Sequence, residues 1–187
     1  VYKRQTSDMN DTWDFPYIAH ALDEVLSQYD MYDVYLLGYS MGGRVALYYA
    51  LNGSVALRGL LLESTSAGIQ SEADKVERVQ VDAARAKVLE IAGLEIFVND
   101  WEKLPLFRSQ YELDAEVRKA IRANRMSQNP VRLAKALRDY GTGNMPNLWP
   151  HVSSLSVRTL ILTGEKDEKF VQIGQKLKEE IPNSHTC

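Results

Sequence analysis

The sequence from Gly38 to Gly42 reads G-x-S-x-G, and its central residue, Ser40, is the strongest candidate for chemistry in the chain. Glycines on both sides of a serine permit a sharp turn from strand to helix, because they remove the Cβ atoms that would clash. The serine is then held in a strained conformation that exposes its hydroxyl. The pattern therefore predicts Ser40 as the reactive hydroxyl, with the backbone N–H of Met41 as an oxyanion donor.

A serine hydroxyl needs a base to accept its proton and an acid to orient that base. Asp167 follows an apolar run late in the chain, where the order serine, acid, histidine requires an acid. Glu165 is the competing carboxylate, and helix capping is the alternative role for Asp167. We predict Asp167 as the acid.

The base is harder to assign, because none of the three histidines has both the required order and the required position. His20 precedes the serine, and His151 precedes the acid. His185 follows the acid but lies at the start of an expected strand, not in a loop beyond it. We therefore expect the base to lie beyond Cys187. Only one strand leads into the turn at Ser40, so a chain truncated at both ends is expected.

Arg44 lies one turn after the reactive serine, at a helical position where a guanidinium has no packing advantage. A guanidinium there can bind a substrate carboxylate through two parallel hydrogen bonds. The middle of the chain is rich in arginine, and most of these arginines are interpreted as solvated helix residues. The full set is Arg78, Arg85, Arg108, Arg118, Arg122, Arg125, Arg132 and Arg138.

Short apolar runs predict the strands that position these residues, at 34–37, 57–62 and 157–163. The pattern from Val45 to Leu51 predicts a helix between the first two runs. Strand, helix and strand in this order form a βαβ unit with parallel strands. The second half of the sheet returns after a long interval, so we predict an α/β fold.

Two details of the βαβ unit bear on the site. Gly42, Ala46 and Ala50 are four residues apart, which predicts a small helix face lying close against the sheet. Ligand sites form at the carboxyl ends of parallel strands, so Ser40 and residues 64–66 should share one rim. The later serines are interpreted as hydrogen-bonding loop residues.

Helical periodicity replaces the strand pattern between Gly68 and about Pro150. Helices are expected after caps at Ser71, Asp114 and Asn129, with a break at 104–107. A helical insertion of this size between two parts of a parallel sheet is typical of a lid over the strand ends. The predicted organisation is a first core part at 6–67, a helical lid at 68–150 and a second, incomplete core part at 151–187.

The composition limits the classes of function. The 187 residues are 45% hydrophobic and 25% charged, which is typical of a globular protein. A net charge of −3 argues against nucleic-acid binding, and no apolar run approaches the roughly 18 residues of a membrane span.

Cys187 is the single cysteine, which fits a reducing cytoplasm. With no metal-ligand cluster or phosphate loop, we expect no cofactor. Residues 1–5 connect to no later pattern and receive no role.

Several longer motifs resemble those of the MenH family, the 2-succinyl-6-hydroxy-2,4-cyclohexadiene-1-carboxylate synthases of menaquinone biosynthesis. The motifs are GYSMGGRVAL at 38–47, LLESTS at 61–66, WEKLPLF at 101–107, RMSQNP at 125–130 and YGTG at 140–143. The resemblance runs from about Thr6 to the end of the chain. It implies an α/β-hydrolase fold with a helical lid and a lyase activity.

The resemblance also implies a reaction and a set of roles. The family releases pyruvate by 2,5-elimination from a substrate with three carboxylates, with Ser40 acting as the base and Asp167 orienting a histidine a few residues past the chain end. An oxyanion-hole glycine motif is expected before Thr6. The substrate-binding positions it implies are Tyr39, Met41, Arg44, Arg78, Trp101 and Arg125, with Arg122 as a substitute for Arg125. No cofactor is implied.

Two other functions remain open from the sequence. The first is a serine hydrolase that cleaves an ester or a C–C bond in a carboxylate-bearing substrate. The second is a binding protein of the same fold in which Ser40 is retained without turnover. Neither the oligomeric state nor the activity of this chain by itself follows from the sequence.

Overall fold

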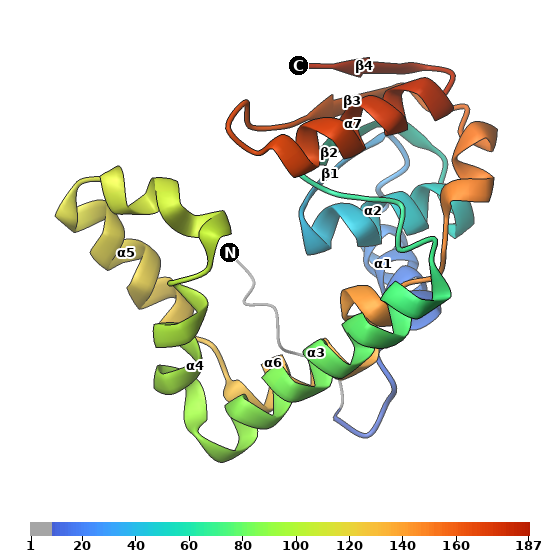
Figure 1. Ribbon diagram of the computed structural model, residues 1–187. Coiled ribbons are helices and arrows are strands. Elements are labelled where there is room, and N and C mark those ends of the chain that lie inside the picture. The colour runs from blue at the N-terminus through green and yellow to red at the C-terminus, as the bar shows by residue number, and fades with distance from the viewer. Residues whose placement is uncertain (1–8) are drawn as a thin grey trace.

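The computed structural model describes residues 9–187, so the segment 1–5 and the start of the first predicted core part lie outside the described residues. Four parallel strands form one sheet in the order β1-β2-β3-β4 (Figure 1). Their bounds are Val34–Tyr39, Leu57–Glu63, Thr159–Leu162 and Ser184–Thr186. The predicted βαβ unit is confirmed, because β1 pairs with β2 in parallel. The third strand is shorter than the predicted 157–163.

Three helices belong to the sheet part of the molecule: α1 (Phe15–Gln28), α2 (Met41–Asn52) and α7 (Glu168–Glu180). Helix α1 begins after Asp14, whose carboxylate accepts a hydrogen bond from the N–H of Tyr17. Helices α2 and α7 pack on one face of the sheet, where Leu47 and Leu177 join Leu60 of β2 in the main core. This core fixes where β1 ends and α2 begins.

The residues of β1 alternate between the two faces of the sheet. Leu36 packs against the main core, whereas Tyr35, Leu37 and Tyr39 are exposed on the opposite face. The apolar run at the start of β1 therefore covers both faces, as the sequence of a parallel strand predicts.

The chain between β2 and β3 is helical, as predicted. Residues 72–144, the helical segment from here on, contain α3 (Glu72–Ile91), α4 (Gly93–Trp101), η1 (Pro105–Glu112), α5 (Ala115–Met126), α6 (Pro130–Tyr140) and η2 (Thr142–Asn144), and η3 (Trp149–Ser154) follows. Helices α3 and α6 lie side by side, and α4 and α5 extend from their far end (Figure 1).

Two local predictions about the helical segment are wrong. The expected break at 104–107 opens into the 3₁₀ helix η1, with Pro105 at its first position. Asp114 precedes α5 but its side chain makes no capping hydrogen bond. The caps at Ser71 and Asn129 are confirmed, because their side chains accept hydrogen bonds from the N–H groups of Asp74 and Arg132.

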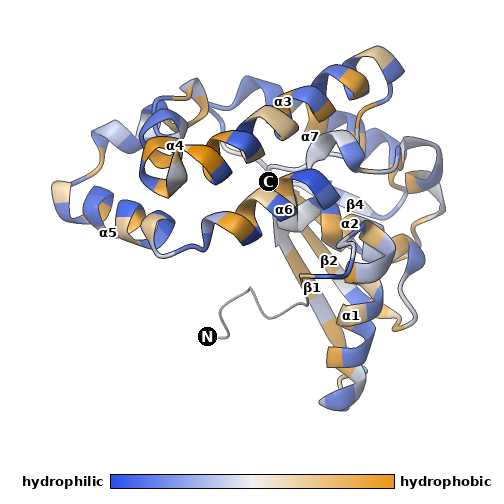
Figure 2. Cartoon of the chain, turned by 90° about the horizontal axis from the view of Figure 1, so that it is seen from below, coloured by the Kyte–Doolittle hydropathy of each residue, from blue (hydrophilic) through white to orange (hydrophobic). Residues whose placement is uncertain are grey.

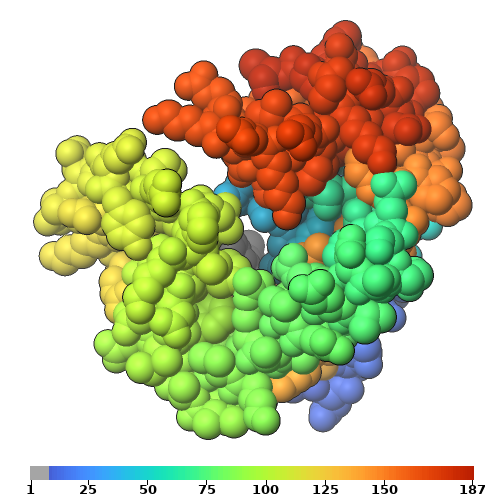
Figure 3. All heavy atoms as spheres, in the orientation of Figure 1, coloured from blue at the N-terminus to red at the C-terminus, as the bar shows by residue number. Residues whose placement is uncertain are grey.

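The helical segment reaches over the carboxyl ends of the strands. Figure 3 shows a deep hollow between the yellow-green part of the segment and the red part that contains β3 and α7. An exposed ion pair between Glu112 of η1 and Lys166, 3.9 Å long, joins the two sides. In the part of the helical segment far from the sheet, α4 is mostly apolar, whereas α5 is rich in charged residues (Figure 2). Within residues 9–187, no helix has both the length and the apolar character needed to cross a membrane.

Helix α1 is tied to α2 by a hydrogen bond from the hydroxyl of Tyr49 to the carboxylate of Asp23. Burial, followed by this bond, raises the pKa of Tyr49 to about 12. Burial also acts to raise the pKa of Asp23, but the hydrogen bonds from Ser54 and Tyr49 outweigh it, so the pKa of Asp23 is lowered. The bond therefore stabilises the fold at pH values between the lowered pKa of Asp23 and the raised pKa of Tyr49.

We predict that Tyr49→Phe lowers the free energy of unfolding at pH 7 by about 1–2 kcal/mol, because it removes one of the donors to a half-buried carboxylate. The difference from the parent should shrink as pH falls through the lowered pKa of Asp23, since a protonated carboxyl no longer needs the donor. It should also shrink as pH rises towards 12, where Tyr49 ionises. Urea unfolding across pH measures this effect. Tyr32→Phe, at an exposed tyrosine, should leave stability unchanged.

Candidate active site

Ser40 lies between the last residue of β1 and the first residue of α2, with φ 51° and ψ −111°. Few non-glycine residues adopt this conformation, and it persists only where surrounding contacts hold it. Two contacts come from the end of β2: the N–H of Ser40 donates to the carbonyl of Glu63 at 2.8 Å, and its carbonyl accepts from Thr65 Oγ1 at 2.8 Å. The side chain of Ser40 makes no capping bond and is half-buried. Its hydroxyl is therefore left available for chemistry.

The predicted role of the flanking glycines is confirmed on one side only. A Cβ on Gly38 would lie 2.4 Å from the carbonyl oxygen of Gly42, so this strand residue must be glycine for α2 to start where it does. A Cβ on Gly42 would meet nothing within 4 Å. The close contact falls instead on Gly43, whose Cβ would lie 2.6 Å from that of Thr65. The small buried face of α2 therefore includes Gly43 and Ala46, not the exposed Gly42.

The end of β2 shares a rim with the serine, as predicted. Ser64 adopts a positive φ of 44° directly after this strand, and its N–H donates to the carbonyl of Leu162 in β3. Thr65, which is buried, makes the hydrogen bond to Ser40 described above. The loop residue with the direct role is thus the threonine between the two serines, which the sequence analysis did not single out.

Asp167 follows β3 and lies at the start of α7, where one carboxylate oxygen accepts from the N–H of Phe170 at 3.2 Å. It is half-buried, whereas its competitor Glu165 is exposed. Strand β2 separates the strands that lead to Ser40 and Asp167. The cap leaves the second carboxylate oxygen free to accept a bond from a histidine.

The described histidines do not complete a triad. His20 is exposed and pairs with Glu24, and His151 and His185 are exposed in η3 and β4. Among residues 9–187, none of the three hydrogen-bonds to Ser40 or Asp167. The same part of the chain contains no group of three or more histidine, cysteine, aspartate or glutamate side chains able to hold a metal ion.

Arg44 is 8% exposed, and its Nη1 atom is buried without a hydrogen-bond partner. Burial, and then the charge of Arg78, lower the pKa of Arg44 to about 10, while Asp82 and Tyr140 oppose this shift. An unpaired buried cation is costly, so this guanidinium is poised to receive an anion. The predicted substrate-binding position 44 thus has the electrostatics of a carboxylate site.

Asp82 is the carboxylate that lies beside these arginines, and no sequence motif pointed to it. It is 2% exposed and accepts from Nε of Arg78 at 2.9 Å, with Nη1 of Arg85 at 3.7 Å. The cluster, formed by Arg44, Arg78, Asp82 and Arg85, holds three guanidiniums and one carboxylate. Its net charge therefore favours a ligand with more than one negative charge.

The remaining predicted residues of the helical segment form a second group. Trp101 stacks on Phe97 with ring centroids 5.5 Å apart, and the guanidinium of Arg85 lies 5.2 Å from its ring. Arg125 lies 4.7 Å over Phe107 and is bound by Glu102 and Gln110. Arg122 also binds Glu102, at 2.7 Å. Arg125 and Arg122 therefore already have partners, whereas Nη1 of Arg44 does not.

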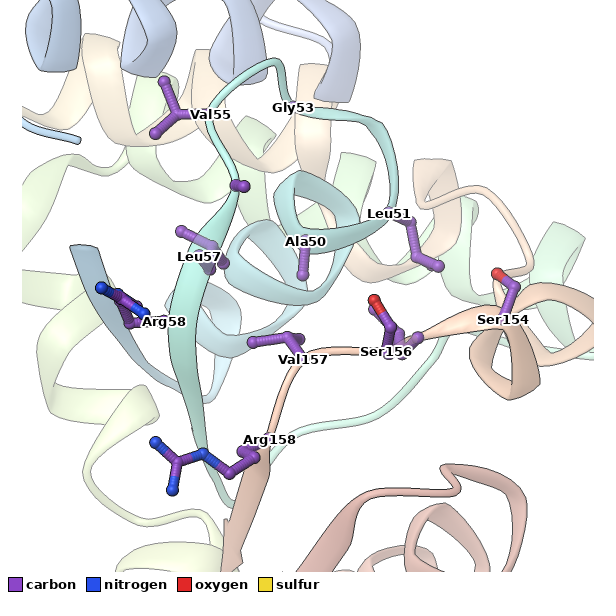
Figure 4. A pocket seen from close by; sticks show the side chains of 12 residues that line it. Ala50, Leu51, Gly53, Val55, Leu57, Arg58, Ser154, Ser156, Val157 and Arg158 are labelled. Atoms are coloured by element: carbon purple, nitrogen blue, oxygen red, sulfur yellow. The ribbon is translucent and has the colours of Figure 1, made fainter. Parts of the chain in front are cut away.

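Among residues 9–187, one cavity lies in the helical segment and another lies beside the sheet. One of about 330 Å³ is lined by Arg122, Arg125 and their neighbours in the helical segment. The other, of about 420 Å³, is lined by Leu57, Val157 and Arg158 among others (Figure 4). Leu57 begins β2, so this larger cavity lies at the amino ends of the strands, whereas Ser40 follows the carboxyl end of β1. Ser40 therefore does not line this larger cavity.

Tyr39 and Met41 flank Ser40 in the chain and are both exposed. They lie at the junction of β1 and α2, so Tyr39, Ser40, Met41 and Arg44 fall within one short stretch of the chain. Arg78 joins them through the charge cluster. Trp101 and Arg125 belong to the outer part of the helical segment.

Comparisons with known proteins agree on one family. Residues 16–185 match the Hydrolase_4 family, described as serine aminopeptidase, S33. A putative 2-succinyl-6-hydroxy-2,4-cyclohexadiene-1-carboxylate synthase of Bacillus subtilis is 39% identical over 163 residues, which are 87% of this chain and 60% of that protein. The corresponding synthase of Yersinia enterocolitica is 32% identical, covering 89% of this chain and 60% of that protein.

A solved structure of MenH from S. aureus superposes with a TM-score of 0.96 and 58% identity, covering all of this chain and 70% of that chain. An esterase from Thermogutta terrifontis, at 24% identity and a TM-score of 0.79, shares the fold. The chain thus has the α/β-hydrolase fold and spans about 60% of the length of the Bacillus and Yersinia relatives.

We predict opposite effects of alanine at the two glycines beside Ser40. Gly38→Ala should lower the free energy of unfolding by more than about 2 kcal/mol, because its Cβ would collide with backbone that cannot move without shifting α2. Gly42→Ala should be neutral or stabilising by up to about 1 kcal/mol, since alanine favours the helix and space is open. Urea unfolding of both variants measures this difference. Equal losses would contradict the assignment of the tight contact to Gly38.

We also predict that Arg44→Met raises the free energy of unfolding of the ligand-free protein by about 1 kcal/mol or more. The substitution removes a buried unpaired charge and keeps most of the side-chain volume. Thermal and urea unfolding in a buffer without polyvalent anions measures the change. The exposed Arg108→Met serves as the control, with no expected change. A destabilised Arg44→Met would show that the guanidinium is satisfied in the free protein.

Proposed function

The chain belongs to the Hydrolase_4 family and, within it, to the MenH group, and on this premise we propose that the protein is a 2-succinyl-6-hydroxy-2,4-cyclohexadiene-1-carboxylate synthase. In the proposed reaction, pyruvate leaves the ring of a 5-enolpyruvyl precursor by 2,5-elimination. The observation that supports it most is the buried guanidinium of Arg44, whose Nη1 has no hydrogen-bond partner and which lies one turn after a strained serine.

The charge cluster supports a substrate with several carboxylates. With three guanidiniums and one carboxylate, it carries two positive charges in excess. Bidentate guanidinium–carboxylate pairs fix orientation as well as contribute affinity. We propose that Arg44 and Arg78 bind substrate carboxylates, with Tyr39, Met41, Trp101 and Arg125 completing the pocket when substrate is present.

The proposed roles at the reacting atoms follow from the elimination itself. A histidine takes the hydroxyl proton of Ser40, and the serine oxygen then takes a proton from the ring. The electrons of that C–H bond enter the new diene, and the C–O bond to the enolpyruvyl group breaks, with its electron pair leaving on the oxygen of a pyruvate enolate. The resulting histidinium, oriented by Asp167 as in other serine triads, gives its proton to the enolate, which leaves as pyruvate. We assign this histidine to none of the three in the described chain. The N–H of Met41 is the proposed donor to the developing negative charge on oxygen.

The helical segment has a proposed role in this reaction. We propose the predicted organisation, in which residues 68–150 form a lid over a core built from 6–67 and 151–187. A closed lid excludes water from the charged site and strengthens its electrostatic interactions. The proposed elimination needs no cofactor, and the proposed location is the cytoplasm.

We predict that Ser40→Ala lowers the rate of pyruvate release at least about 10³-fold, because no other group can accept the ring proton. The assay uses protein from the complete reading frame that encodes this chain and follows pyruvate with a coupled dehydrogenase. Ser109→Ala, at an exposed serine, is the control.

The absence of pyruvate release from a folded parent protein would contradict the synthase proposal. Hydrolysis of a carboxylate-bearing ester, with a Ser40-linked acyl intermediate, would then support the serine-hydrolase alternative. Ligand binding unaffected by Ser40→Ala, with no turnover of either substrate, would support a binding protein.

A further inference from the structure

Arg78, Asp82 and Arg85 lie on one face of α3, because their spacing of four and three residues matches the helical repeat. This face is directed towards Arg44, whose pKa responds to the charges of both Arg78 and Asp82. Each of the three guanidiniums has a different environment. Arg78 and Arg85 share Asp82, whereas Nη1 of Arg44 has no partner.

Both oxygens of Asp82 are used. Oδ1 faces the guanidiniums of Arg78 and Arg85, and Oδ2 accepts from the N–H of Gly143 at 3.4 Å. A Cβ on Gly141 would lie 2.7 Å from Oδ2, so the turn after α6 closes directly onto the carboxylate. Asp82 is therefore fixed from two directions, and it fixes the two arginines in turn.

We propose that Asp82 is a positioning residue of the anion site, which holds Arg78 and Arg85 in place for substrate carboxylates while Arg44 stays unpaired. This inference rests on the proposed polyanionic substrate. It adds a residue that does not itself touch substrate and acts through two guanidiniums. The carboxylate also keeps like charges together, since without it Arg78 would repel both Arg44 and Arg85.

The direction of the change in anion affinity separates this proposal from simple electrostatics. Asp82 carries the same charge as the ligand, so its neutralisation alone should strengthen the binding of an anion. If Asp82 positions the arginines, its neutralisation should weaken binding, because the guanidiniums lose their common anchor and separate. The two accounts therefore predict opposite changes in affinity for the same substitution.

The experiment measures binding of propane-1,2,3-tricarboxylate by isothermal titration calorimetry at pH 7 and low ionic strength, with protein from the complete reading frame. We expect Asp82→Asn to weaken binding about tenfold or more. Glu77→Gln, an equal charge change at an exposed position of α3, should leave affinity within about twofold. Unchanged or tighter binding by Asp82→Asn would overturn the proposal, as would a parent protein that does not bind the tricarboxylate.

A double-variant cycle tests whether Asp82 acts through the arginines. In an Arg78→Gln and Arg85→Gln background, Asp82→Asn should cause no further loss of affinity. An equal loss in both backgrounds would indicate a general structural effect and overturn the positioning role. Circular dichroism and thermal unfolding check that each variant is folded.

If Asp82→Asn fails to fold, Asp82→Glu provides the test, because it keeps the charge and displaces the carboxylate by one methylene group. Weaker binding by Asp82→Glu supports positioning, and unchanged binding contradicts it. The titration does not depend on turnover. A protein that binds the tricarboxylate in the predicted way but releases no pyruvate would therefore refute the synthase proposal and leave the role of Asp82 supported.

Discussion

The backbone of Ser40 is the constraint on which the site depends. Its positive φ places the side chain away from the sheet, and it is held by the carbonyl of Glu63 and the hydroxyl of Thr65. Both contacts come from the next strand, so the βαβ unit is at once the core of the fold and the clamp on the serine. Because Gly38 leaves room for α2 to start immediately, Arg44 falls one helical turn away and on the buried side. The position of the cation is thus a consequence of the same turn that exposes the serine.

The charge cluster shows how stability and binding oppose each other in this molecule. A guanidinium buried without a partner costs free energy in the free protein, and that cost can be recovered only when an anion arrives. Asp82 limits the cost by neutralising part of the cluster, yet its second oxygen is committed to the turn at Gly143. One carboxylate therefore cannot satisfy three arginines, and the remaining charge is directed at ligand.

Much of the fold was predictable from the sequence, because its determinants are local. The strand, G-x-S-x-G turn and helix follow one another within 34–52, and the caps at Asp14, Ser71 and Asn129 each depend on residues three apart. Two of the misses depend on packing between distant segments, whereas the missing side-chain cap at Asp114 is local. Gly43, not Gly42, meets Thr65 across the βαβ unit. Asp82 resembles a solvated partner of Arg78 at i and i+4, and only its contact with the turn at Gly143, 61 residues later, reveals that it is buried.

The proposed anion site is assembled from two separate parts of the chain. Arg44 belongs to the helix that follows the serine, whereas Arg78, Asp82 and Arg85 belong to the segment inserted between β2 and β3. A change confined to that insertion can therefore alter which ligands are selected without disturbing the strained turn or the sheet. A protein with the same sheet and a different α3 would therefore place a different set of charges beside Arg44.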